Sequence, residues 1–249
     1  MSSVQILGYI STVAQLLPIA VIFSLKLYKN RSLAFLMIYC LSTLLYNLMS
    51  EGIIALPHDY VKASGIINNL LDVPLALLYM IYFAKTASFR KKIHFIILGF
   101  SVFEVIAVAF LGFNKTALTV IMGPGILLLI TLSFMFFVKQ IKDVVQYSKP
   151  AGKALMSAST LFLYGCFFII YLFWYVLKAE SLHDDAFKVY FFVVTLSSLL
   201  MTIGLIAEKK QFKMLEELET TRKELSLLYP NEKIAFPKET AGMLKDEGF

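Results

Sequence analysis

The sequence predicts an all-α integral membrane protein: a seven-transmembrane-helix bundle with its N-terminus outside, its C-terminus cytoplasmic, and a short cytoplasmic C-terminal helix. Three observations predict this fold: the composition, seven apolar runs and a one-sided distribution of basic residues. The 249 residues are 59% hydrophobic and 16% charged, whereas soluble domains contain about 45–50% apolar and about 25% charged residues. A core of this size cannot bury so much apolar surface, so we expect lipid to be the solvent for much of it.

The apolar runs follow one another along the chain, and each is near the roughly 20 residues that a helix needs to cross the hydrocarbon core. The predicted segments are Val4–Leu25, Leu33–Leu56, Gly65–Phe83, Ile93–Phe113, Ala117–Val138, Leu155–Leu177 and Ala186–Ala207. Polar breaks such as Pro57-His58-Asp59 and Arg90-Lys91-Lys92 separate them. Residues 1–207 are therefore expected to form one transmembrane domain.

The basic residues near the segment ends predict the orientation. The odd-numbered loops and the start of the tail hold 14 Lys and Arg residues, and the even-numbered loops hold 4. Cytoplasmic loops carry an excess of Lys and Arg, so the N-terminus is expected outside. The net charge of +6 then reflects topology and attraction to anionic lipids rather than a nucleic-acid partner. We expect a multi-pass protein of the bacterial inner membrane.

The chain changes character at residue 208. Residues 208–228 read as a charged helix. Four of its six heptad core positions are apolar, namely Met214, Leu218, Leu225 and Leu228, and the other two are Gln211 and Thr221. Pro230 ends the helix, and the remainder to residue 249 is expected to be a flexible polar end. The helix either lies on the inner leaflet or docks a second copy or a cytoplasmic signalling partner.

Three acids fall inside the predicted segments, where an acidic side chain costs at least about 2.5 kcal/mol. Glu51, Asp72 and Glu104 would lie about 8, 10 and 14 Å from the outer ends of their helices at about 1.5 Å per residue. No Lys or Arg lies at comparable depth. These acids should therefore be protonated, or should bind a cation or a positively charged ligand.

Other polar residues extend this candidate site. Three amides share helix faces with the acids: Asn47, Asn68 and Asn69. Further candidates on the last two helices are Tyr171, Trp174, Tyr190, Ser197 and Ser198. We expect Gly123-Pro124-Gly125 to break the regular hydrogen bonding of its helix beside this site. The alternative interpretation is that the polar groups hold the helices together, each contributing about 0.6–2 kcal/mol.

No catalytic residue, cofactor or metal site is predicted, because no hydrolase, zinc-protease or nucleotide-binding motif occurs in the sequence. The seven-helix plan with an outside N-terminus resembles that of the microbial rhodopsins. That family needs a lysine in the middle of helix seven, where this chain has Ser197 and Ser198, with Lys188 only at the rim. Retinal is therefore not expected.

The sequence favours a receptor-like or sensory membrane protein that binds a small or cationic ligand in an outward-facing polar pocket of helices two to four. The charged extension at 208–228 favours this function, because a carrier does not need it. The alternatives are a proton- or cation-coupled transporter that uses the intramembrane carboxylates, and an intramembrane lipid-modifying enzyme.

Overall fold

A computed structural model of the chain describes residues 3–147, 151–173 and 183–228. All regular structure within these ranges is helical, and seven of the helices are long and apolar enough to cross a membrane. The helices are α1 (Ser3–Ser24), α2 (Arg31–Ser50), α3 (His58–Met80), α4 (Ala87–Leu111), α5 (Lys115–Tyr147), α6 (Gly152–Tyr171) and α7 (His183–Leu228), with short 3₁₀ helices η1 (Leu27–Lys29) and η2 (Ile81–Phe83). The predicted seven apolar helices of membrane-spanning length are confirmed, and the orientation of the bundle stays a prediction.

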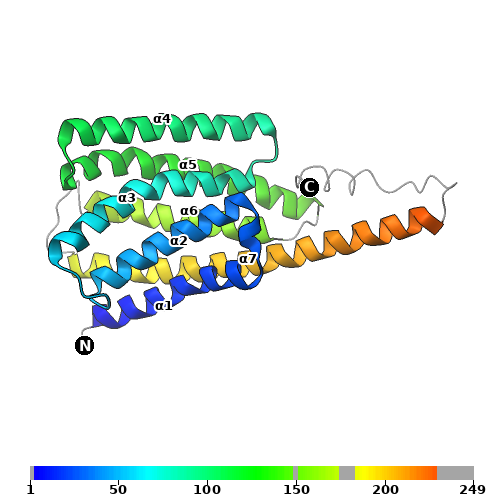
Figure 1. The fold of residues 1–249 in the computed structure, drawn as a ribbon, viewed down its shortest axis with the longest axis horizontal. Coiled ribbons are helices and arrows are strands. Elements are labelled where there is room, and N and C mark those ends of the chain that lie inside the picture. Colours follow the sequence, from blue (N-terminus) through cyan, green and yellow to red (C-terminus); the bar gives the residue numbers. More distant parts are fainter. Residues whose placement is uncertain (1–2, 148–150, 174–182, 229–249) are drawn as a thin grey trace.

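The helices run up and down along one axis (Figure 1). We call the end at which α1 begins the amino end, and the end beyond which α7 continues the tail end. Six helices form a closed ring, because α1, α2, α3, α5, α6 and α7 each pack on the next and α7 returns to α1. Helix α4 lies outside this ring against α3 and α5.

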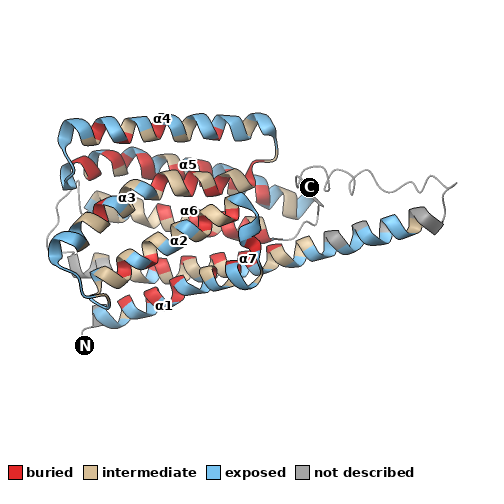
Figure 2. Cartoon of the chain, viewed as in Figure 1, coloured by how far each residue is buried: buried red, intermediate tan, exposed pale blue. Residues whose placement is uncertain are grey.

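The outer surface of the bundle is apolar. Helix α4 is largely exposed in Figure 2, and its exposed side chains include Phe95, Val105 and Phe110, which are 73%, 69% and 85% exposed. Water would penalise such a surface, but lipid tails are its natural solvent. The interior is tightly packed with large side chains such as Tyr79, Phe83 and Phe136.

Helices α2 and α3 have different bounds from those predicted. Helix α2 ends at Ser50 instead of Leu56, with Glu51 as its C-cap and Gly52 at φ +74°. Helix α3 begins at His58, seven residues before Gly65, directly after Pro57 and with an acid in its first turn, both of which favour a helix start. Glu51 therefore lies just past its helix, and Asp72 lies about 21 Å from the start of α3, near its middle.

Helix α5 continues through the Gly-Pro-Gly stretch, so the helix is not interrupted there, although Pro124 has no N–H to donate to the preceding turn. The glycines instead allow close helix packing. A Cβ atom at Gly123 would lie 2.8 Å from the Tyr171 Oη, and one at Gly125 would lie 2.7 Å from the Val73 Cγ2. Pro124 between them is exposed and points away from these contacts.

Helix α7 is continuous over 46 residues, about 69 Å at about 1.5 Å per residue. It joins the predicted seventh segment and the predicted tail helix without an interruption at residue 208. Figure 1 shows that it leaves the bundle along the bundle axis. The end of the sixth predicted segment, after residue 173, and the polar end after residue 228 lie outside the described residues.

Candidate functional site

Asp72 lies among three helices in the middle of the bundle. Tyr164 of α6 donates a hydrogen bond to the Asp72 Oδ2 at 3.2 Å, and its hydroxyl lies 3.2 Å from that of Tyr39 on α2. Tyr164 is 1% exposed, so its hydroxyl needs a partner inside the protein. The Asp72 carboxylate is thus held by one hydroxyl donor, which also lies beside the Tyr39 hydroxyl.

Glu104 lies on α4, which packs against the helix that carries Asp72. It is 7% exposed, although α4 is the most peripheral helix. Its Oε1 is buried and has no hydrogen-bond donor among the described residues. Two of the predicted acids thus lie on neighbouring helices, and we call them the Asp72–Glu104 pair.

A second group of polar side chains, the amino-end cluster, joins α1, α2 and α7. Thr12 of α1 donates to the Glu51 Oε1 at 2.9 Å, and Asn47 of α2 donates to the Gln15 Oε1 at 3.0 Å. Tyr190 of α7 lies near Asn47. Burial raises the pKa of the Glu51 carboxyl above its ordinary value, and the hydrogen bond from Thr12 opposes part of this rise.

The other predicted residues make bonds that hold helices. Asn68 accepts a bond from Ser42 of α2 at 2.9 Å, and Tyr171 donates to the Thr119 carbonyl of α5 at 2.9 Å. Ser197 exchanges bonds with Ser159 of α6. These contacts match the alternative interpretation in which polar groups join helices.

Two more predicted residues bond within their own helices. Asn69 donates to the Gly65 carbonyl at 2.7 Å, and the Ser198 carbonyl accepts from Thr202 at 2.7 Å. Trp174 lies outside the described residues.

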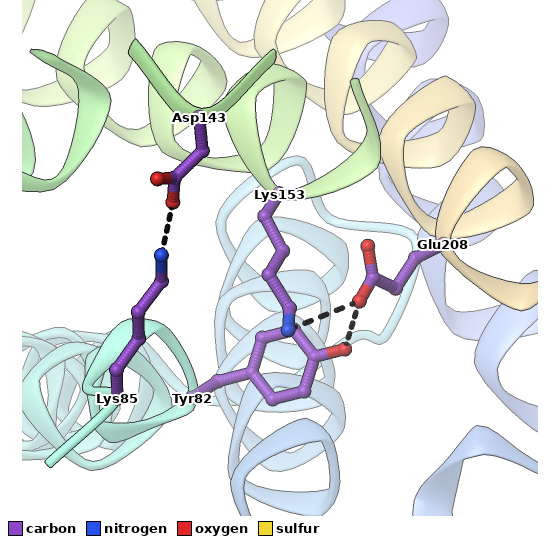
Figure 3. A network of polar contacts seen from close by, with 5 residues as sticks. All are labelled: Tyr82, Lys85, Asp143, Lys153 and Glu208. Atoms are coloured by element: carbon purple, nitrogen blue, oxygen red, sulfur yellow. Dashed lines mark hydrogen bonds and ion pairs between the residues drawn. The ribbon is translucent and has the colours of Figure 1, made fainter. Parts of the chain in front are cut away.

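A third polar group, the tail-end cluster, consists of Tyr82, Lys153 and Glu208 (Figure 3). Tyr82 of η2 donates to the Glu208 Oε1 at 2.6 Å, and the Lys153 Nζ lies 3.6 Å from the same oxygen. The ammonium also lies 5.0 Å from the centre of the Tyr82 ring, within the range of a cation–π contact. Glu208 is fully buried. Beside the cluster, Lys85 and Asp143 form a second ion pair.

Several of these residues were not predicted from the sequence. Glu208 was the first residue of the predicted tail, yet it lies inside the bundle. Thr12 and Gln15 of α1 and Tyr39 and Tyr164 were also not predicted. One signal was available for the tyrosines: a hydroxyl in the middle of an apolar run needs a partner across the helix interface.

The surroundings restrict the chemistry of the acids. Within the described part of the chain, no Lys or Arg forms an ion pair with Glu51, Asp72 or Glu104. In the same residues, no group of three or more His, Cys, Asp and Glu side chains could hold a metal ion. The arrangement can hold a proton or receive a positive charge. Family models, curated proteins and solved structures were all compared with this chain, and none of them matches it.

Proposed function

We propose that this protein is a membrane receptor or sensor, in which the interior acids bind a small or cationic ligand and α7 transmits the bound state. The observation that carries the proposal is the path of α7. One continuous helix contributes Tyr190 to the amino-end cluster, Glu208 to the tail-end cluster, and then the charged extension beyond the bundle. A rigid helix that touches both polar clusters is a suitable element to carry a displacement between them.

The ligand class follows from charge. Asp72 and Glu104 are acids with no basic ion-pair partner among the described residues. A cation or an amine would supply the positive charge that these acids lack. In this proposal the amino end faces outward, the tail end faces the cytoplasm of a bacterial inner membrane, and the extension contacts a second copy or a signalling partner there. Reporter fusions at both chain ends test this orientation.

The function is tested with purified protein and a panel of probes: sodium, potassium, a primary amine and a quaternary amine. We expect one probe to raise the unfolding temperature, because a ligand that binds only the folded state stabilises it. The same probe should change the distance between spin labels on the α7 extension and on α5. Asp72→Asn should abolish both effects, and Glu217→Gln on the exposed extension should preserve them. The proposal fails if every probe that binds leaves the extension in place.

A specific observation favours a second candidate, a proton- or cation-coupled transporter. Acids lie at three levels of the bundle: Glu51 at the amino end, the Asp72–Glu104 pair in the middle and Glu208 at the tail end. Such a series is typical of relays in pumps and carriers. Flux into proteoliposomes that stops in Asp72→Asn would identify the transporter.

A further inference from the structure

Four aromatic rings of α6 and α7 form a continuous row between the middle of the bundle and its amino end. The rings of Tyr164 and Phe167 on α6 lie edge to face, with their centroids 6.0 Å apart. Phe167 stacks on Tyr190 of α7 at 5.4 Å and an interplanar angle of 13°. The Tyr190 ring lies 5.4 Å from that of Phe191. We call these four rings the aromatic row.

An acid lies at each end of the aromatic row. At the inner end, the Tyr164 hydroxyl donates to the Asp72 Oδ2 at 3.2 Å. At the outer end, a Cβ atom added at Gly8 would lie 3.4 Å from the Phe191 Cζ and 3.0 Å from the Glu51 Oε1, so one position of α1 borders both the ring and the acid. The Glu51 Oε2 is buried and has no hydrogen-bond donor among the described residues. The row therefore joins two acids that lie at different levels of the bundle.

The aromatic row is most open toward the amino end. Tyr164, at the inner end, is buried, whereas the other three rings are half-buried. Phe167 and Tyr190 contact each other across the interface of α6 and α7, and Phe191 lies beside α1. In contrast, the next residue of α7, Phe192, is 61% exposed, as expected of a side chain that faces lipid. The uncovered surface of the three half-buried rings is available to a ligand.

The tail-end cluster combines a carboxylate, a tyrosine and an ammonium in one contact set (Figure 3). Tyr82 donates to the Glu208 Oε1 at 2.6 Å, and the Lys153 ammonium lies 3.6 Å from that oxygen and 5.0 Å from the centre of the Tyr82 ring. Asp72 and Tyr164 repeat the carboxylate and its tyrosine donor. Among the described residues, however, no Lys or Arg forms an ion pair with Asp72. The chain thus supplies the ammonium at the tail end, and a ligand is the natural source of one at Asp72.

The chemistry of the row selects among cations. A small hard cation prefers a shell of oxygen ligands, which phenylalanine rings do not supply. Aromatic faces instead attract ammonium ions, and quaternary ammonium groups are recognised in this way. We propose that the ligand is an alkylated ammonium ion, which enters beside Glu51 and binds along the aromatic row with its positive charge toward Asp72. This inference rests on the proposed function and names the class of its ligand.

The test is calorimetric titration of the purified full-length protein with choline, with the uncharged alcohol in which carbon replaces the choline nitrogen, and with sodium chloride. Choline should bind at least about 10-fold more tightly than its carbon isostere, because only the charged form is attracted by the rings and the acids. Phe167→Leu removes one aromatic face and keeps an apolar side chain, so it should weaken choline binding about 5- to 30-fold. The matched control is Phe89→Leu. Phe89 is also half-buried and contacts another ring, that of Phe136 at 5.7 Å, but lies at the tail end. Its replacement should leave choline binding unchanged.

Three results would overturn the inference: no binding of choline to the wild type, equal binding of choline and its carbon isostere, and equal affinity of Phe167→Leu and the wild type for choline. The comparison of choline with its isostere uses the wild type alone and does not depend on whether a variant folds. The spin-label distance to the α7 extension is recorded in the same titrations. Choline that binds as expected with an unmoved extension would refute the receptor function and leave the ammonium site intact. Sodium that moves the extension of a protein that does not bind choline would refute the ammonium site and leave the receptor function intact.

Discussion

Replacing Lys153 by methionine should destabilise the bundle where α7 leaves it. The change removes the ammonium 3.6 Å from the Glu208 Oε1 and keeps most of the length of the side chain. It also removes the contact of the ammonium with the Tyr82 ring, 5.0 Å away. The carboxylate stays fully buried, between α6 and η2.

The size of the effect follows from the geometry. Two unit charges 3.6 Å apart interact by about 4–5 kcal/mol at an effective dielectric constant of about 20. Removing one partner of a buried pair costs about 3–5 kcal/mol. The Lys153 side chain keeps 19% of its surface exposed, and solvent weakens the interaction, so we expect about 3 kcal/mol. Glu208→Gln should cost less, about 1–2 kcal/mol, because the amide oxygen still accepts the bond from Tyr82.

The assay is unfolding of the purified protein in one detergent by increasing SDS, followed by circular dichroism. The matched control is Lys213→Met, since Lys213 forms an ion pair with Glu217 on the exposed extension of the same helix. That pair should contribute no more than about 0.5 kcal/mol. Equal stability of Lys153→Met and the wild type, or equal losses in Lys153→Met and Lys213→Met, would refute the argument that the tail-end cluster anchors α7.

Four further substitutions test other parts of the molecule by the same assay. Gly152→Ala should cost about 1–3 kcal/mol, because the new Cβ would lie 2.7 Å from the backbone nitrogen of residue 208. Gly165→Ala on the same helix meets nothing within 4 Å and should raise stability by up to about 1 kcal/mol; a loss like that of Gly152→Ala would contradict the packing argument. Tyr164→Phe should cost about 1.5–3 kcal/mol, because it removes a donor to a buried carboxylate, and an unchanged stability would argue against an ionised acid there. The folded state holds the Glu51 proton more strongly than the unfolded state. Wild-type stability should therefore decline as the pH rises above about 4.5. Glu51→Gln should remove this part of the decline, and identical pH profiles of the variant and the wild type would show that Glu51 is not buried in solution.

The seven segments could be predicted because each is a long apolar run, but a hydropathy profile does not show where a helix ends. The residues after Glu51 are apolar, and the second predicted segment therefore ran on to Leu56. In the structure, Gly52 turns the chain, and Ile53 and Leu56 are 50% and 42% exposed. Side-chain transfer free energies add up along the chain regardless of its backbone conformation, so they could not reveal this turn.

The candidate site could be predicted only in part, because its contacts cross between helices. The acids were recognisable from their cost in an apolar segment. Tyr164, however, is 92 residues from Asp72 along the chain, and no local pattern pairs two such positions. Glu208 was missed for a different reason: charged residues follow it, so its surroundings in the sequence resemble a solvated tail. Its burial depends on Tyr82, 126 residues away.

Contacts of α3 and η2 with α7 connect the middle of the bundle to the extension. Asp72 lies on α3, and Tyr79 of the same helix contacts the Met201 sulfur of α7 at 3.6 Å. About two turns further along α7, Glu208 is bound by Tyr82 of η2, the short helix that directly follows α3. A shift of α3 at Asp72 would therefore act on α7 at two levels on the tail-end side. Because α7 is also held by Lys153 of α6, the tail-end cluster determines whether that shift moves the extension or is resisted. Loosening the cluster with Glu208→Gln should increase the displacement of the extension when a probe binds, and an unchanged displacement would place the coupling elsewhere in the bundle.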